Sequence, residues 1–120
     1  MSNKDRDFVR LKHLNEAIQL IIEFTHELDL SAFTSNKMAQ AAVMREFEII
    51  GEASKNISVE TQNLFPNIPW RLMGDFRNLL IHEYFMVDIG EVWATVQNDI
   101  PALSEQIKDA IRFLEQDKLK

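Results

Sequence analysis

The stretch DRDFVRLKHLNEAIQLIIEFTHELD at residues 5–29 carries the pattern that decides the fold. Its apolar side chains recur every three or four residues, which is the spacing of one face of an α-helix. The positions on this face are Phe8, Leu11, Leu14, Ile18, Ile21, Ile22, Thr25 and Leu28. The spacing predicts one amphipathic helix over residues 5–29, whose apolar face must be covered by other helices.

The composition limits what those other elements are. The chain of 120 residues is 46% hydrophobic and 27% charged, which suits a folded protein with a core. It has only three Gly and three Pro, too few for many short strands joined by tight turns. We therefore predict one domain over residues 1–120, an all-α up-and-down bundle of about four long helices with short helical segments. A bundle of this size leaves part of an apolar stripe uncovered, so we expect a homodimer.

The second long helix is predicted to start at a cap on Thr34 or Ser35 and to run to about Ile57. Its strong helix formers support this interpretation. Its apolar face is expected to hold Met38, Ala42 and Ile49, with Phe47 and Ile50 on the flank. The methionines Met38, Met44 and Met73 are interpreted as core filler.

Prolines and capping residues mark the remaining elements. Ser58 is expected to start a short helical turn, and Pro69 suits the first turn of a third long helix over residues 69–85. Asp88, followed three residues later by Glu91, is typical of a helix N-cap. A last helix is predicted over residues 102–116.

Charge and cysteine content exclude several classes of protein. The chain has no Cys, which excludes disulfide scaffolds, thiolate metal sites and cysteine nucleophiles. The net charge of −6 argues against a broadly basic surface, so any contact with nucleic acid needs a local basic pocket. The polar N-terminus lacks the apolar core of a signal peptide, and no stretch is apolar enough to span a membrane. We therefore expect a cytoplasmic protein that does not bind membranes.

Cofactor and DNA chemistry find no support in the sequence. The residues His13, His26 and His82 are scattered without the spacing of a metal-binding motif, and the three glycines stand alone rather than in a phosphate-binding loop. We predict neither a metal nor another cofactor. No candidate recognition helix has a basic face, so DNA is not an expected partner.

The chemically informative stretch is WRLMGDFRNLLIHEYF at residues 70–85. On a helix, Arg77 lies within an apolar stripe that Trp70, Met73, Ile81 and Tyr84 complete. An unpaired buried guanidinium is costly, so Arg77 needs a partner. One interpretation pairs it with a buried acid of the second helix, such as Glu48 or Glu52. The other places it beside a phosphate, which its planar fork can bind through two hydrogen bonds.

A second face of the same helix would hold Asp75, Asn78 and His82. His82 near a helix C-terminus has a structural interpretation, because a cationic imidazole suits the negative end of the helix dipole. It also has a catalytic one, since histidine is the natural proton carrier near neutral pH. Taken separately, Arg77 and His82 both look structural.

Taken together, they form the pattern Arg77-x4-His82-x-Tyr84, preceded by Ile68-Pro69-Trp70-Arg71 and followed by Phe85-x-Val87-Asp88. This combination closely resembles the HepT-like toxins of the HEPN superfamily, whose hallmark is R-x4-H-x-Y. The upstream IIGEASK at residues 49–55 is similar to that family as well. The resemblance covers roughly residues 42–103.

The resemblance implies a function and a set of roles. HEPN proteins are small helical bundles that pair as homodimers, bring two R-x4-H motifs into one cleft, and in many cases cleave RNA without a metal. Carried over by position, Arg77 would bind the scissile phosphate and His82 would act as the acid–base residue, with Asn78 in support. Basic residues such as Arg71, Arg45 and Lys55 could add to a positive groove.

Tyr84 also has two interpretations. It could be a core or interface aromatic with a satisfied hydroxyl. The resemblance instead implies that Tyr84 accepts AMP from a cognate MNT-type nucleotidyltransferase antitoxin, which would make the chain the toxin of a toxin–antitoxin pair. The alternative function is a non-catalytic HEPN partner subunit of a nucleotidyltransferase.

Overall fold

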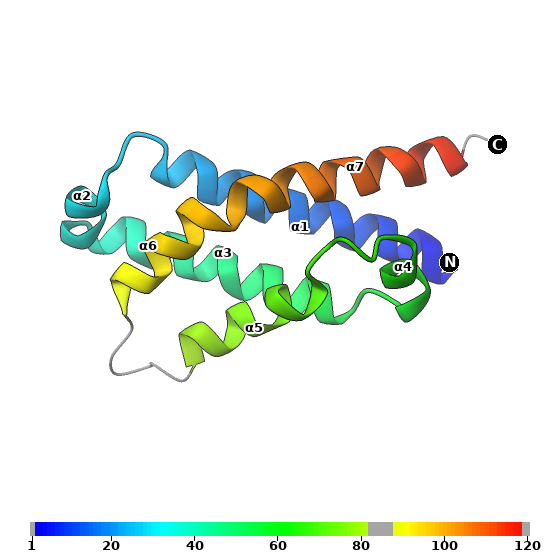
Figure 1. The fold of residues 1–120 in the computed structure, drawn as a ribbon, viewed down its shortest axis with the longest axis horizontal. Helices are drawn as coiled ribbons and strands as arrows, with labels where there is room; N and C mark the ends of the chain where they lie inside the picture. Colours follow the sequence, from blue (N-terminus) through cyan, green and yellow to red (C-terminus); the bar gives the residue numbers. More distant parts are fainter. Residues whose placement is uncertain (1, 82–87, 119–120) are drawn as a thin grey trace.

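The computed structural model describes residues 2–81 and 88–118, without the side chains of residues 78–81 and 118 (Figure 1). Over these ranges the chain forms seven α-helices and no strand, which confirms the all-α prediction. The helices are α1 (Asn3–Thr25), α2 (Leu30–Ser35), α3 (Lys37–Lys55), α4 (Val59–Leu64), α5 (Trp70–Ile81), α6 (Ile89–Asn98) and α7 (Ile100–Lys118).

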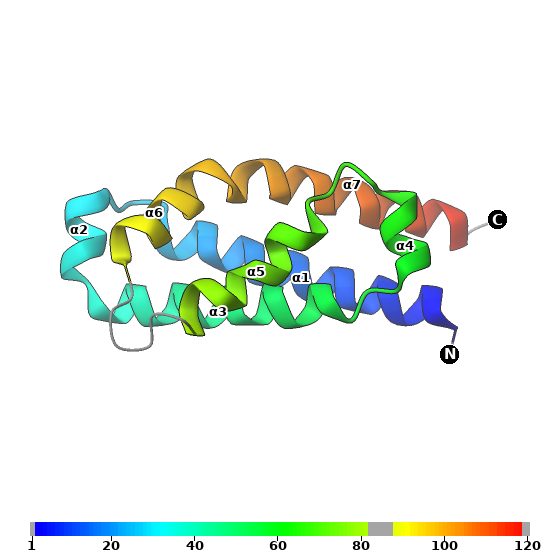
Figure 2. The same ribbon diagram turned by 60° about the horizontal axis from the view of Figure 1, so that its bottom comes forward.

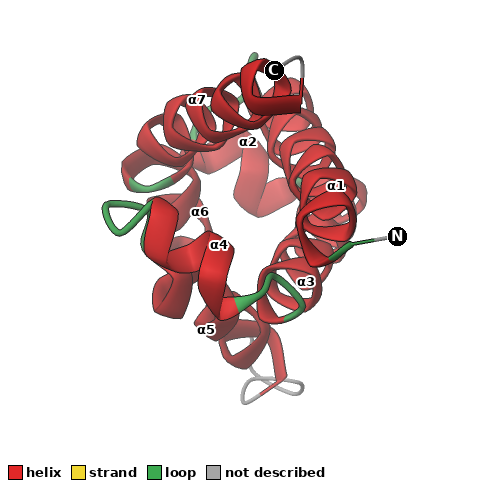
Figure 3. Cartoon of the chain, turned by 90° about the vertical axis from the view of Figure 1, so that its right-hand side faces the viewer, coloured by secondary structure: helices red, strands yellow, loops and turns green. Residues whose placement is uncertain are grey.

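The long helices run alternately up and down an elongated bundle of 49 × 28 × 23 Å (Figures 1 and 2). Helix α1 packs against both α3 and α7, while α5 packs against α3. Helices α6 and α7 follow one another along the same side of the molecule (Figure 2). Seen along the bundle, the helices surround a common core, and α5 lies next to α3 (Figure 3). No helix in the described ranges is long and apolar enough to cross a membrane.

The core lies where the α1 pattern predicts it. The side chains of Leu11, Leu14, Ile18 and Ile21 are fully buried. Each such side chain stabilises the fold by about 1.5–3 kcal/mol relative to an exposed position. Helix α1 itself ends at Thr25 rather than at residue 29, because Asp29 caps the next helix by accepting a hydrogen bond from the Ala32 N–H.

The start of the second long helix was predicted wrongly. Residues 30–35 form the separate helix α2, and Asn36 is the N-cap of α3. The Asn36 side chain accepts a hydrogen bond from the Ala39 N–H at 2.9 Å, and its backbone is extended, with φ −110° and ψ 91°. A side-chain acceptor and an extended backbone break the helix at this residue, so neither Thr34 nor Ser35 caps α3.

The predicted face of α3 is also rotated from the observed one. Phe47 and Ile50, which the sequence predicts on the flank, lie in the buried face of α3. The buried residues of this helix are Val43, Phe47, Ile50, Gly51 and Ser54. Ala42 and Ile49 are only partly buried, and Met38 is 83% exposed and is not core filler. The reason is that α3 packs between α1 and α5, and the face that touches both is centred on Phe47 and Ile50.

The other predicted boundaries fare better. Ser58 and Asp88 are N-caps, accepting hydrogen bonds from the N–H groups of Thr61 and Glu91 respectively. The third long helix is described from Trp70 to Ile81, and the rest of its predicted length lies outside the described residues. Helix α7 extends beyond residues 102–116 at both ends. Pro101 sits in its first turn, where an N–H has no helical partner to lose.

One buried carboxylate ties α1 to the start of α4. Asp7 is 1% exposed and accepts hydrogen bonds from the Ser58 N–H at 3.0 Å and the Ser58 hydroxyl at 2.5 Å. The Thr61 hydroxyl donates a third bond at 2.6 Å. Because burying a carboxylate without partners is costly, these donors determine how α4 joins the bundle.

Candidate functional site

Arg77 is placed by a close approach of α5 to α3. The ring of Phe76 meets that of Phe47 edge to face, with centroids 5.0 Å apart. On the next turn of α3, Gly51 lets the backbones of α3 and α5 come together, because a Cβ at this position would lie 3.2 Å from the Arg77 Cβ and 3.3 Å from its backbone N. The absence of a side chain at Gly51 thus allows Arg77 to pack directly against α3.

The guanidinium of Arg77 is paired but exposed. Its Nη1 lies 3.6 Å from Oε2 of Glu52, which confirms the predicted pairing with an acid of the second long helix. The side chains of Arg77 and Glu52 are 45% and 65% exposed, so the expected burial of this pair is wrong. Among residues 70–77 of α5, whose side chains the structure describes, Met73 and Phe76 are buried, and Arg77 lies at the edge of that face. An exposed ion pair of this length contributes little to stability and leaves guanidinium donors available to a ligand.

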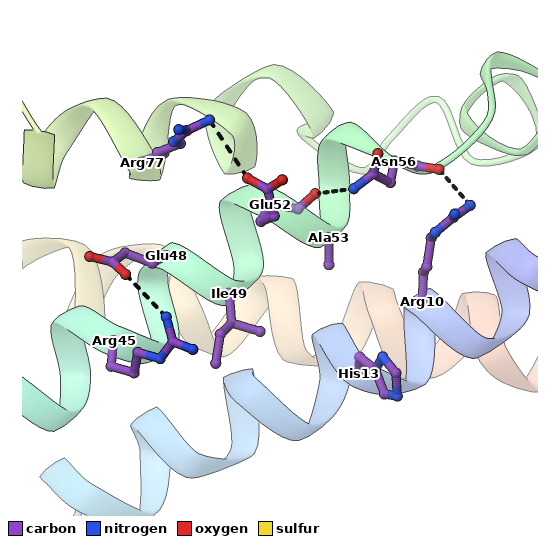
Figure 4. A pocket seen from close by; sticks show the side chains of 9 residues that line it. All are labelled: Arg10, His13, Arg45, Glu48, Ile49, Glu52, Ala53, Asn56 and Arg77. Carbon is purple, nitrogen blue, oxygen red and sulfur yellow. Dashed lines mark hydrogen bonds and ion pairs between the residues drawn. The ribbon is translucent and has the colours of Figure 1, made fainter.

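A groove of about 550 Å³ opens beside this pair (Figure 4). Helix α3 forms its floor, with α5 on one side and α1 on the other (Figure 4). The lining residues are Arg10, His13, Arg45, Glu48, Ile49, Glu52, Ala53, Asn56 and Arg77. The groove therefore collects three arginines and one histidine from three helices of a chain whose net charge is −6.

The groove contains some of the predicted basic residues and not others. Arg45 lines it, with Nη1 3.3 Å from Oε2 of Glu48. Arg71 is exposed on α5 but does not line it. Lys55 is directed elsewhere, since its side chain lies against Gly74, with Cε 3.8 Å from where a Cβ would stand. Of the predicted basic residues, Arg77 and Arg45 therefore line the groove.

Two basic side chains of the groove were missed by sequence reasoning. Arg10 and His13 lie one turn apart on α1, where charged residues opposite an apolar stripe ordinarily face solvent. The spacing places them on one face, but no signal in the sequence shows that this face borders α3. The Arg10 Nη1 donates to the backbone carbonyl oxygen of Asn56 at 2.9 Å, which holds it at the groove.

The rest of the predicted motif can be placed only in part. Asp75 is exposed on α5, and Asn78 belongs to the same helix, although its side chain is not described. His82 and Tyr84 lie outside the described residues. Within residues 2–81 and 88–118, no group of three or more His, Asp or Glu side chains is arranged to hold a metal ion.

Comparison with known proteins adds independent information. The family described as "Ribonuclease HepT-like" matches residues 14–110. A protein of Thermococcus cleftensis named "Probable ribonuclease HepT" is 48% identical over 103 residues, covering 86% of this chain and 92% of the relative. A protein of Methanocaldococcus jannaschii, named as a candidate RNase, is 42% identical over 93 residues, which cover 78% of this chain and 85% of the relative. No solved structure is a significant match.

The family match covers α3 and α5 and includes Arg77, Asn78, His82 and Tyr84. It begins at residue 14, so the groove residues Arg10 and His13 of α1 lie before it. The resemblance that the motif at residues 77–84 carries thus extends over most of the chain. The protein belongs to the HepT-like ribonuclease family of the HEPN superfamily.

Proposed function

We propose that this protein is an endoribonuclease that cleaves RNA without a metal ion and works as a homodimer. Family membership supports the reaction class. The observation that carries the proposal for this chain is the guanidinium of Arg77, 45% exposed at the edge of the groove and held by one ion pair of 3.6 Å. Such a group can leave a carboxylate for a phosphate at small cost.

The proposed reaction is attack by the RNA 2′-hydroxyl on the adjacent phosphorus. The 2′-oxygen forms a bond to phosphorus while the bond from phosphorus to the 5′-oxygen breaks. The proton of the 2′-hydroxyl passes to a base, and the leaving 5′-oxygen receives a proton from an acid. We assign this acid–base work to His82. The products are a cyclic phosphate end and a 5′-hydroxyl end.

Arg77 is assigned to the phosphate itself. Negative charge gathers on the non-bridging oxygens in the transition state, where a guanidinium already in place stabilises it most. Its fork can donate to two oxygens at once, which a lysine ammonium does not reproduce. Asn78, next along α5, is assigned to orient either the imidazole or a phosphate oxygen.

A homodimer with one shared cleft would explain how a negatively charged chain binds RNA, which is also negatively charged. RNA is repelled by a protein of net charge −6 unless cations are concentrated at one place. Two copies of Arg77 in one cleft, each in a groove that Arg45 also lines, would supply that concentration. This assembly is proposed from the resemblance to HEPN proteins.

We further propose that the protein is the toxin of a toxin–antitoxin pair and that an MNT-type nucleotidyltransferase antitoxin inactivates it by adding AMP to Tyr84. The adduct would bring bulk and negative charge close to Arg77 and His82, repelling RNA from the site. The intact mass of the toxin after co-expression with its partner tests this. An AMP adduct that is absent from Tyr84→Phe is expected, whereas no adduct, or one that persists in Tyr84→Phe, contradicts it.

Cleavage of total RNA in EDTA by the wild type and His82→Ala tests the reaction. We expect the wild type alone to cleave and to leave cyclic phosphate ends. No cleavage by wild-type dimer whose intact mass shows no AMP would contradict the proposal. It would favour the alternative function, a non-catalytic partner subunit of a nucleotidyltransferase.

A further inference from the structure

The groove continues well past Arg77. Its floor is the face of α3 from Arg45 to Asn56, a length of about 16 Å at the rise of an α-helix. Arg77 and Arg45 lie toward one end of this face, and Arg10 lies at the other, with His13 beside it on α1 (Figure 4). A single phosphate at Arg77 would leave most of this length empty.

Arg45 and Arg10, the other two arginines of the groove, have N–H donors available for a ligand. Arg45 is 68% exposed and pairs with Glu48, an exposed neighbour on its own helix. Arg10 uses Nη1 for the Asn56 carbonyl oxygen, and the same atom lies 3.8 Å from Asp7. A guanidinium carries five N–H donors, so each arginine can bind a phosphate oxygen without giving up all of its present contacts.

The centre of the groove is apolar on the side that faces α1. Ile49 and Ala53 are partly buried and separate the Arg45–Glu48 pair from Arg10, with Ile49 directed toward α1 (Figure 4). Charged edges around an apolar floor suit a nucleic-acid strand, whose phosphates are anionic and whose sugars and bases offer apolar surface. His13 adds a ring N–H donor from the side of α1.

We infer that Arg45, Arg10 and His13 form a subsite for the backbone phosphates of an RNA strand, adjoining the phosphate bound by Arg77. The inference rests on the proposed function, because it takes RNA as the ligand. These residues bind and position the strand, and they take no part in bond cleavage. Three arginines against two glutamates give the groove the sign that a polyanion requires.

The test uses exposed residues and matched controls. The variants Arg45→Gln and His13→Gln remove groove contacts. Arg112→Gln removes an equally exposed arginine, which is paired with Asp109 three residues away at 3.1 Å, from outside the groove. His26→Gln does the same for an exposed histidine at the far end of α1. The ligand is a fluorescent single-stranded 2′-O-methyl oligonucleotide, which lacks the attacking hydroxyl, and binding is followed by anisotropy.

We expect Arg45→Gln and His13→Gln to weaken binding by about threefold to tenfold, as loss of one solvent-exposed hydrogen bond does, while both controls bind as the wild type does. The slope of log affinity against log salt is expected to fall by about 0.7 in Arg45→Gln and to stay unchanged in Arg112→Gln. Equal affinity and slope in groove and control variants, or a wild type that does not bind the oligonucleotide, would overturn the subsite.

Cleavage of unmodified RNA by the same proteins separates the two proposals. If the wild type cleaves RNA and the groove variants bind and cleave as the controls do, the subsite is wrong and the ribonuclease stands. If the groove variants lose affinity but the wild type cleaves nothing, the RNA subsite stands and the ribonuclease falls.

Discussion

Glu52 of α3 faces Arg77 of α5 across a helix crossing, with the carboxylate oxygen 3.6 Å from the guanidinium nitrogen and both side chains in contact with solvent. The same two helices meet closely at Gly51, the residue before Glu52, where an added Cβ would lie 3.2 Å from the Arg77 Cβ. The backbone of Arg77 is therefore held firmly while its charged end is held weakly. This combination suits a residue that must exchange a carboxylate for a phosphate.

Removing the carboxylate should strengthen RNA binding. In Glu52→Gln, RNA phosphate no longer competes with an anion for Arg77, so we expect affinity to rise about twofold to fivefold, with unfolding free energy changed by no more than about 0.5 kcal/mol. Asp109→Asn on α7 is the control, because it removes the same charge from a pair of 3.1 Å outside the groove. Anisotropy and urea unfolding measure the two quantities. A loss of cleavage as deep as that of Arg77→Ala would show instead that Glu52 orients Arg77.

The close approach of α3 and α5 predicts opposite effects at two glycines. At Gly51 an added Cβ would meet the Arg77 backbone N at 3.3 Å, so Gly51→Ala should force the helices apart and cost about 1–3 kcal/mol. At Gly74 the nearest atom is the flexible Lys55 Cε at 3.8 Å, so Gly74→Ala should be neutral or stabilise the helix by up to about 1 kcal/mol. Urea unfolding of both variants checks this. Equal stability of the two would mean that the crossing is not tight.

The buried Asp7 should be one of the most sensitive polar positions in the fold. Asp7→Ala leaves the Ser58 N–H and the Ser58 and Thr61 hydroxyls without their acceptor, so we expect a loss of about 2–4 kcal/mol of unfolding free energy. Asp109→Ala, at an exposed carboxylate, should change stability by no more than about 0.5 kcal/mol. A similar loss of unfolding free energy in both variants would show that the hydrogen bonds of Asp7 are not important for stability.

The unfolding free energy of the protein should depend on pH through the titration of Glu46. Burial raises the pKa of this carboxyl, and nearby Glu16 raises it further against the opposing effect of Arg45. The folded state therefore holds the proton more tightly than the unfolded state, and stability falls as the pH rises from about the ordinary value of 4.5 through the folded pKa.

Glu46→Gln removes this loss. The variant should be more stable than the wild type at pH 7, and the difference should disappear below the ordinary carboxyl pKa, where both states of the wild type are protonated. Urea unfolding at several pH values tests this, with Glu23→Gln at an exposed position of α1 controlling for the change in net charge. A Glu46→Gln variant that is less stable at pH 7 would contradict the assignment.

The sequence predicts most of the fold because local signals decide it. The period of α1, the caps at Ser58 and Asp88 and the break before Trp70 depend on neighbours in the chain. The predictions that were wrong depend on tertiary packing. The sequence does not show that α3 packs between α1 and α5, which rotates its buried face away from Met38.

In the candidate site too, local sequence predicts some features, while tertiary packing decides the others. Arg77 stands out in sequence because a charge interrupts an apolar stripe, and its pairing with Glu52 follows from the acids available on α3. Its exposure could not be predicted, since it depends on how α5 crosses α3 at Gly51. Arg10 and His13 join the groove only through the packing of α1 against α3.

The central claim is that the guanidinium of Arg77 binds the scissile phosphate, and the most direct measurement compares RNA cleavage by the wild type, Arg77→Lys and Arg71→Lys. Arg71 is the matched control, an exposed arginine on the same helix that does not line the groove. We expect Arg77→Lys to slow cleavage by about 100-fold or more, since an ammonium cannot donate through two parallel bonds, and Arg71→Lys to cleave as the wild type does. Full activity in Arg77→Lys would contradict the claim.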